Sequence, residues 1–216
     1  MWNACTNTSH TYFIPLPDCR GLNAPLQAAD TNFQSTDSVV VAVLGCGYNT
    51  LTYKGSMDVF RKHFSGLYFF KQMPDDKKRM VVLSEFGLNL LDFQFTNDSA
   101  QLMNAQEFLN KPGLIELMKG DFGFLVNGIK TSEVLKSRHQ TPKKGVERTR
   151  IKTEKGQFTL YHRVTDQRLV RVKRRQGWFS SVKYSFTYGN SDLPEEIMIR
   201  HTGLPFKMKL KKIKEE

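Results

Sequence analysis

The chain has 216 residues, of which 39% are hydrophobic, and it carries a formal net charge of +11. A chain of this length buries roughly 70% of its unfolded surface, which is enough for one substantial core. No apolar run approaches the ~18–20 residues of a membrane-spanning helix. The longest run, Val39–Leu44, has the length of a strand, so no transmembrane helix is predicted.

The positive charge is concentrated in the second half of the chain. From Lys130 to Glu216 there are 22 Lys and Arg residues against 9 Asp and Glu residues. A basic half of this kind suits an acidic partner, such as a phosphate backbone, anionic lipid head groups or lipopolysaccharide. A solvated basic surface that only aids solubility is the alternative.

The N-terminal region shows little periodicity and holds all three cysteines. Residues 1–36 are rich in Asn, Thr, Pro and Ala, which predicts an extended arm ahead of a single domain over residues 37–216. The odd cysteine count argues against a complete disulfide framework. Cys5 and Cys19 could form one bridge in an oxidising compartment, or Cys5, Cys19 and Cys46 are all free thiols.

Two of these cysteines are candidates for lipidation. Cys46 follows Val43-Leu44-Gly45, which resembles a lipobox, but a buried cysteine at a strand end is the alternative. The first residues lack the basic and apolar regions of a secretory signal. If the natural precursor is longer than this chain, a lipidated Cys5 would lie near the mature N-terminus, and Cys5 is the lipidation site we predict.

The first half of the domain is predicted to be an antiparallel meander, because turn signals recur every 8–12 residues. In Phe64–Gln72 the apolar residues occupy both alternating faces, with Phe64, Tyr68 and Phe70 on one and Leu67 and Phe69 on the other. Such a sheet is either covered on both sides or curved around apolar material. The predicted strands are Val39–Leu44, Thr50–Phe60, Phe64–Gln72, Arg79–Phe86 and Leu88–Thr96.

A helical interval over residues 104–126 is predicted next. Asn104 and Glu107 have the spacing of a capping box, and Pro112 suits the first turn of a second helix that ends at Gly120. Residues 127–153 are polar and basic, which indicates a loop-rich segment.

Strands return after Gly156, where apolar and polar residues alternate again. The face that carries Val182, Tyr184 and Phe186 is predicted to point inward together with Trp178. The last strand, Phe206–Lys211, alternates without a break. Two meanders around one helical interval predict an α+β fold with a curved antiparallel sheet of roughly 8–11 strands and the helical segment on one face.

The segment Ser65–Lys71, followed by Glu85–Phe95, resembles a group of uncharacterised envelope lipoproteins of Bacteroidetes-type bacteria. The similar stretch runs roughly from Tyr53 to Val126. That group is similar in fold to the LolA/LolB lipoprotein carriers. The resemblance implies an open half-barrel whose concave face is apolar and partly closed by helices, and a lipid-anchored protein of the outer membrane that faces the periplasm.

The predicted function is a non-enzymatic envelope lipoprotein that binds a lipid, an acyl chain or a lipidated partner in an apolar cleft. The strands offer more apolar surface than one helical cover needs. We expect a monomer. The candidate lining residues are Phe69, Leu83, Leu91, Phe93, Phe108, Ile115 and Met118.

The alternative is a structural or adaptor component of an envelope complex that uses the basic half of the chain. The residues predicted to contact a membrane surface or a partner are Arg171, Arg174, Arg175, Lys207, Lys209 and Lys211. Lysines on an edge strand also block edge-to-edge pairing without any ligand. Although Trp178 and Phe179 follow the 171–175 basic cluster, no RNP-type or helix-turn-helix signal accompanies them, so nucleic acid is not expected as a partner.

No catalytic residue, metal site or cofactor is predicted. The five histidines are scattered, and the chain contains no HExxH, CxxC, GxSxG, Walker or GxGxxG motif. Glu85 and Asp92 could face each other as a carboxylate pair, as in glycosidases. We favour the alternative, in which Glu85 ends its strand and Asp92 pairs with a basic residue such as Arg61 or Lys71.

Overall fold

The computed structural model describes residues 39–41, 43–45, 48–176 and 180–213. Among the sequence predictions, the arm over residues 1–36, the lipidation of Cys5 or Cys46 and the inward position of Trp178 lie outside the described residues. No helix in the described part of the chain is both long and apolar enough to cross a membrane.

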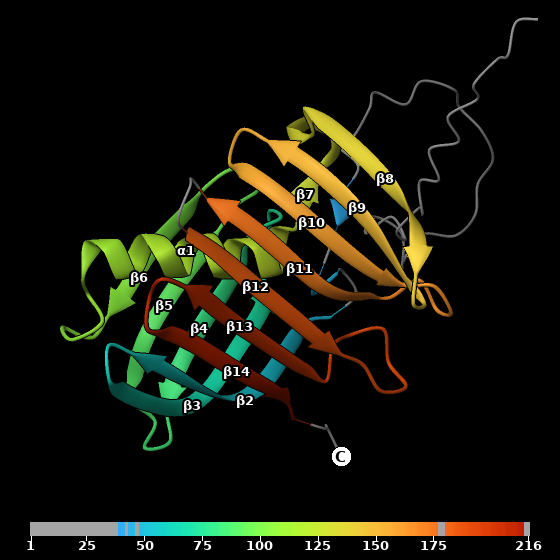
Figure 1. Ribbon diagram of the computed structural model, residues 1–216. Helices are drawn as coiled ribbons and strands as arrows, with labels where there is room; N and C mark the ends of the chain where they lie inside the picture. Colours follow the sequence, from blue (N-terminus) through green and yellow to red (C-terminus); the bar gives the residue numbers. More distant parts are fainter. Residues whose placement is uncertain (1–38, 42, 46–47, 177–179, 214–216) are drawn as a thin grey trace, which may run out of the picture.

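A twelve-stranded antiparallel sheet forms most of the molecule (Figure 1), in the order β6-β5-β4-β3-β2-β14-β13-β12-β11-β10-β9-β8. Two meanders, β2–β6 and β8–β14, join through the pairing of β14 with β2. The strands are β2 (Thr50–Val59), β3 (Lys62–Gln72), β4 (Lys78–Ser84), β5 (Asn89–Phe95), β6 (Ala100–Ala105), β8 (Lys136–Lys143), β9 (Val146–Thr153), β10 (Gly156–Arg163), β11 (Leu169–Gln176), β12 (Ser180–Thr187), β13 (Glu196–Thr202) and β14 (Phe206–Lys212).

The sheet is not closed, and it curves around α1 (Pro112–Asn127), which Figure 1 shows crossing behind the strands. The predicted α+β fold with an open, curved half-barrel is therefore confirmed. The short pair β1 (Val39–Val41) and β7 (Ile129–Lys130) and a 3₁₀ turn, η1 (Thr131–Glu133), complete the described elements.

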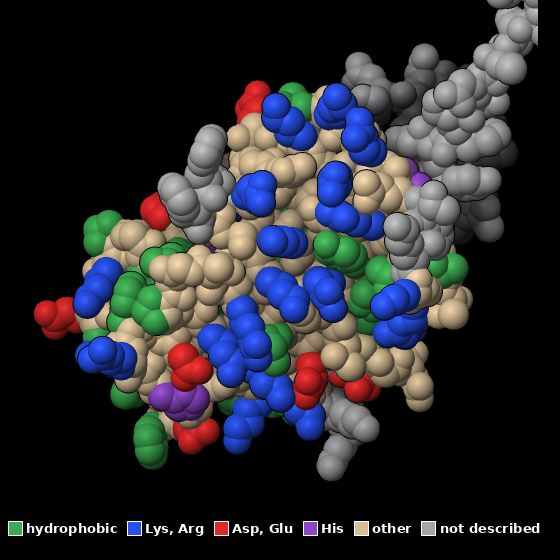
Figure 2. All heavy atoms as spheres, in the orientation of Figure 1, with side chains coloured by type: hydrophobic (Ala, Val, Ile, Leu, Met, Phe, Trp, Pro, Cys, Tyr) green, Lys and Arg blue, Asp and Glu red, His purple; other side chains and the backbone are tan. Residues whose placement is uncertain are grey.

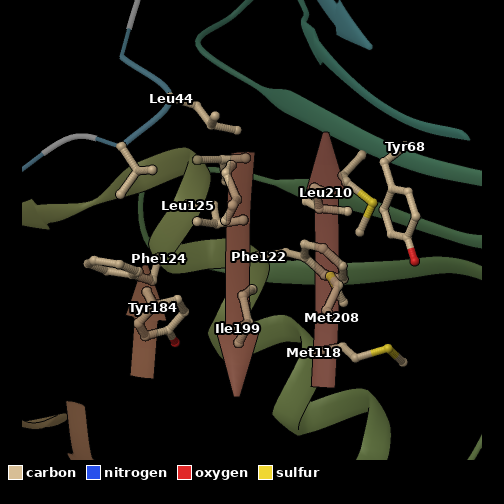
Figure 3. Packing of buried hydrophobic residues seen from close by; sticks show 14 of the residues in the cluster. Leu44, Tyr68, Met118, Phe122, Phe124, Leu125, Tyr184, Ile199, Met208 and Leu210 are labelled. Carbon is tan, nitrogen blue, oxygen red and sulfur yellow. The ribbon is translucent and has the colours of Figure 1, made fainter. Parts of the chain in front are cut away.

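The concave face carries the core. Phe122 of α1 contacts the rings of Tyr68, Phe70 and Phe93 at centroid distances of 6.3–6.4 Å. On the other meander, Tyr184 lies on the same inner face, with its ring 4.7 Å from that of Phe124. Figure 3 shows the side chains of α1 directed between those of the strands. Both meanders thus bury their alternating apolar residues against one helix.

The opposite, convex face of the first meander is only half-buried. Leu67, Phe69, Val81 and Leu83 point there, because they alternate with the buried Tyr68, Phe70 and Val82. Of the two arrangements that the two-sided apolar pattern predicts, the structure therefore has the curved one.

Three details of the predicted elements are wrong. The capping-box segment at Asn104 ends β6 and continues as a turn, and the helix starts only at Pro112. That helix does not end at Gly120, because the buried Phe122 and Leu125 beyond it continue the inner face. Residues 127–153 contain β7, β8 and β9, so the sheet has more strands than the 8–11 predicted.

Candidate ligand-binding groove

A groove of about 390 Å³ lies on the open side of the half-barrel, where the two ends of the sheet flank α1. Gly120, Gly123 and Asn127 of α1 line it together with residues from both ends of the sheet. From the first meander come Phe95 of β5 and Ala100 of β6, and from the second come Thr153 of β9, Phe158 of β10 and Arg174 of β11. This volume falls in the range of small-molecule sites.

The groove exists because α1 carries two glycines, Gly120 and Gly123, on the face that lines it. Glu116, Gly120, Gly123 and Asn127 follow a spacing of three or four residues and share one helical face. A Cβ added at Gly123 would lie 3.7 Å from Cε1 of Phe95, which is an ordinary contact. The groove is therefore the space that longer side chains at these positions would fill.

The lining combines aromatic rings with charged groups. Phe95, Phe124 and Phe158 are buried in the core and contribute apolar surface only through the small exposed part of each ring. Three ion pairs lie around them, Lys119–Glu116 at 2.7 Å, Lys130–Asp98 at 3.1 Å and Lys155–Glu133 at 2.5 Å. A ligand with both an apolar part and a polar part finds matching surfaces here.

The ion-pair and hydrogen-bond partners of Glu133 keep its side chain ionised. Burial raises the pKa of Glu133, but hydrogen bonds from Lys155 and from the backbone N–H of Lys130 outweigh burial and bring the pKa below its usual value. Glu133 therefore stays a carboxylate at neutral pH, so the groove carries acidic as well as basic groups.

Arg174 connects the sheet to the helix at this groove. Its Nη1 donates a hydrogen bond of 3.2 Å to the carbonyl oxygen of Gly120, and its guanidinium lies 5.8 Å from the ring centroid of Phe158. Arg174 was predicted to share a surface with Arg171 and Arg175. The structure separates them, because Arg174 alternates with these two and points to the concave side.

A buried polar cluster holds α1 beneath the groove. The hydroxyl of Tyr184 donates to Oδ1 of Asp121 at 2.7 Å, and Nε2 of His201 lies 2.6 Å from Oδ2. Burial and then the charge of Asp121 raise the pKa of Tyr184 well above its usual value, so the phenol keeps its proton. At the C-terminal end of α1, the ammonium of Lys78 donates to the carbonyl of Val126, and burial lowers the pKa of Lys78.

The structure does not bring the seven predicted lining residues together. Leu91 and Phe93 are buried in the core beneath α1, and Ile115 and Met118 belong to the buried face of α1 itself. Phe69 and Leu83 lie on the convex face, and Phe108 stacks on Phe64 with ring centroids 4.9 Å apart. None of the seven lines the groove.

Sequence reasoning missed the residues that do line the groove. The signal for the helical part was present, because Gly120 and Gly123 lie one helical turn apart among buried residues. It was lost once Gly120 was interpreted as the end of the helix. Phe95 and Phe158 could not be connected to it, because they come from opposite ends of the sheet.

The other basic residues predicted to contact a membrane surface or a partner lie on the outside of the sheet. Arg171, Arg175, Lys207, Lys209 and Lys211 are exposed on the convex face of the second meander, which Figure 2 shows covered with basic side chains.

The predicted carboxylate pair has separate partners. Glu85 lies 3.8 Å from Lys54, whereas buried Asp92 accepts two hydrogen bonds from Arg79, at 3.0 and 2.7 Å. Asp92 thus pairs with a basic residue as favoured, but with Arg79 instead of Arg61 or Lys71. Among the residues that the structure describes, no group of three or more His, Cys, Asp or Glu side chains could hold a metal ion.

Comparison with known proteins gives only distant structural similarities. No family model and no curated protein matches it. A putative outer membrane lipoprotein-sorting protein domain from Vibrio parahaemolyticus is similar over 78% of this chain and 85% of its own, with 6% identity and a TM-score of 0.46. A LolA superfamily protein from Nitrosomonas europaea is similar over 77% and 84%, with 7% identity and a TM-score of 0.44.

Similarities this distant assign neither a family nor a function to this chain. We therefore argue function from the residues of this chain.

Proposed function

We propose that this protein is a non-enzymatic carrier that binds an acyl chain, as part of a lipid or of a lipidated partner, in the groove beside α1. The observation that supports the proposal is the groove itself, with three phenylalanines and a set of charged residues around Gly120 and Gly123 of α1. An acyl chain would lie against Phe95, Phe124 and Phe158. The polar end of the ligand would lie among the charged groups, close to Arg174.

The lining residues predicted from the sequence could contact a ligand only in a different conformation of the protein. Leu91, Phe93, Ile115 and Met118 are fully covered by α1 or form its buried face. They can contact a ligand only if α1 moves away from the sheet, which would break the contacts of Asp121, Arg174 and Lys78 described above. The groove is accessible without any such movement.

The setting we propose is the cell envelope, with the folded domain tethered to the outer membrane through a lipid on Cys5 and the arm over residues 1–36. This part of the proposal is separate from the groove. Intact-mass analysis of the protein from its native host tests it. An acyl-glyceryl adduct on an N-terminal Cys5 supports the anchor, and an unmodified Met1 contradicts it.

Filling the groove tests the binding proposal. The substitution Gly123→Leu places a side chain between Phe95 and Phe158, and Leu is a better helix former than Gly. We expect the variant to fold and to bind a fluorescent fatty acid at least tenfold more weakly than the parent chain. Native mass spectrometry of the parent chain, extracted gently, should also show a co-purified lipid.

Gly113→Leu is the matched control, because Gly113 also lies in α1 but a Cβ there meets nothing within 4 Å. Its affinity for the probe should equal that of the parent chain. If both variants bind as the parent does, or if the parent binds no acyl probe, the groove is not the ligand site.

A further inference from the structure

The convex face of the second meander carries a line of cations that crosses seven adjacent strands. Six of the seven positions in register along this line are Lys or Arg, and only Thr159 of β10 interrupts them. We call these six residues the cation row. They are Arg138, Arg150, Lys173, Lys183, Arg200 and Lys207.

The cation row is unfavourable for the isolated protein. Like charges directly opposite each other on neighbouring strands repel and destabilise a sheet. Lys183, for example, pairs with Lys173 on one side and with Arg200 on the other. In the described part of the chain, no carboxylate lies within ion-pair distance of any member of the row. Asp58 of β2 is the cross-strand partner of Lys207, so this end of the row has an opposite charge in register. The rest of the row has no such partner, which points to an external anion.

Two parallel rows widen this line into an array. One contains Arg148, Arg171 and Lys209, and the other contains Lys136, Lys152 and Arg175. Lys209 alone has an acidic neighbour, Glu196 at 3.6 Å. Figure 2 shows the basic side chains spread over this face instead of gathered at one point.

The centre of the array is a shallow trough along β10 of about 330 Å³. Its middle strand offers neutral hydrogen-bonding groups, Gln157, Thr159 and Tyr161, between basic residues of β9 and β11. The Nε atom of Arg148 is buried there and has no hydrogen-bond partner among the described residues. Such a lining suits phosphate oxygens, which accept from guanidinium and hydroxyl groups alike.

The aromatic content of the array decides between two kinds of polyanion. Single-stranded nucleic acid is bound by stacking its bases on aromatic rings. The one aromatic side chain in the trough, Tyr161, lies between Arg148 and Arg171, whose guanidinium carbons are 5.8 and 5.6 Å from its centroid. Its ring is thus engaged from both flanking strands. Among the described residues, the array is two-dimensional and offers no free stacking platform, which matches the head groups of a lipid surface.

We infer that the protein docks on an anionic bilayer through the convex face of β8–β14, with the cation row at the centre of the contact. This inference does not rest on the proposed groove, which lies on the opposite side of the sheet. Docking in this orientation leaves the groove open to the solvent. Each cation near an anionic surface contributes roughly a fivefold gain in binding.

Vesicle co-sedimentation tests the inference with phosphatidylcholine vesicles that either lack phosphatidylglycerol or contain a one-third share of it. We expect binding to the anionic vesicles alone, and a loss of binding as salt is raised. The double variant Lys183→Glu/Arg200→Glu should bind at least ~25-fold more weakly, from the loss of two cations. The same variant should melt at a higher temperature than the parent, because two like-charge pairs, Lys173 with position 183 and Lys207 with position 200, become opposite pairs. Positions 183 and 200 face each other and remain one like-charge pair.

Lys62→Glu/Lys111→Glu is the matched control. It changes the net charge equally, but Lys62 and Lys111 lie outside the three rows. Equal losses of vesicle binding in both double variants would show that only net charge matters and would overturn the inference. Failure of the parent to bind anionic vesicles, or tighter binding of a single-stranded oligonucleotide than of the vesicles, would overturn it as well.

Discussion

At the scale of single residues, the buried charges of this protein are explained by their partners. Asp121 is 1% exposed, and both its carboxylate oxygens are engaged, by Tyr184 and by His201. His201 lies 80 positions away in the chain. The sequence shows each of these residues but not that they meet, because no local pattern encodes a pairing between a helix and a distant strand.

Removal of Asp121 should therefore destabilise the protein strongly. Asp121→Ala leaves the hydroxyl of Tyr184 and the ring of His201 buried without their acceptor, and breaking a buried pair typically costs about 3–5 kcal/mol. Urea unfolding measures the loss. The comparison is Asp98→Ala, which removes an exposed partner of Lys130 and should change stability by less than about 1 kcal/mol. Equal effects of the two substitutions would contradict this account.

His162 gives the fold a dependence on pH. Burial lowers its pKa; the charge of Glu147 opposes this shift and that of His139 adds to it. An unfolded chain takes up a proton at this histidine near pH ~6.5, whereas the folded protein does so only at lower pH. The stability associated with neutral His162 is therefore complete above pH ~6.5 and is lost as the pH falls below it.

Thermal melting between neutral and mildly acidic pH checks this dependence. His162→Gln should lose less stability on acidification than the parent chain does. A parent chain that becomes more stable on acidification would contradict the predicted direction of the pH dependence.

At the scale of elements, α1 packs against the concave face of the sheet to form the core, and it also lines the groove. It begins where Lys111 is extended and Pro112 takes the first helical position, and it ends at Gly128 with a φ of 68°. Sequence reasoning identified Pro112 correctly but placed a helix before it and a stop at Gly120. The strands β8 and β9 were missed because their inner faces carry Ser137, His139 and Thr149, which hide the apolar alternation.

Two glycines of this element should respond to alanine in opposite ways. At Gly123 the new methyl group makes only an ordinary contact, so Gly123→Ala should raise stability by about 0.5–1 kcal/mol. At Gly128 the positive φ strains any residue with a Cβ, so Gly128→Ala should lower stability by roughly 1 kcal/mol or more. Chemical denaturation measures the free energy of unfolding of both variants. A stabilising effect of Gly128→Ala would contradict the positive φ at the end of α1.

At the scale of the whole molecule, the two faces of one sheet have different properties. The concave face is apolar and wraps α1, and the convex face of the second meander is basic. The overall architecture followed from the sequence, because regular turn spacing and two-sided apolar strands leave few alternatives to a curved meander. The groove did not, because residues of β5, β9–β11 and α1 define it, and only the curvature of the open sheet brings these elements together.

The central claim is that an acyl chain binds beside Gly123 and not on the half-buried convex face of β3 and β4. Paramagnetic broadening of amide signals by a spin-labelled fatty acid tests it in one measurement. The account predicts selective broadening at Gly120, Gly123 and Asn127, with Phe69 and Leu83 unaffected. Broadening centred on Phe69 and Leu83, or no broadening at saturating probe, would contradict it.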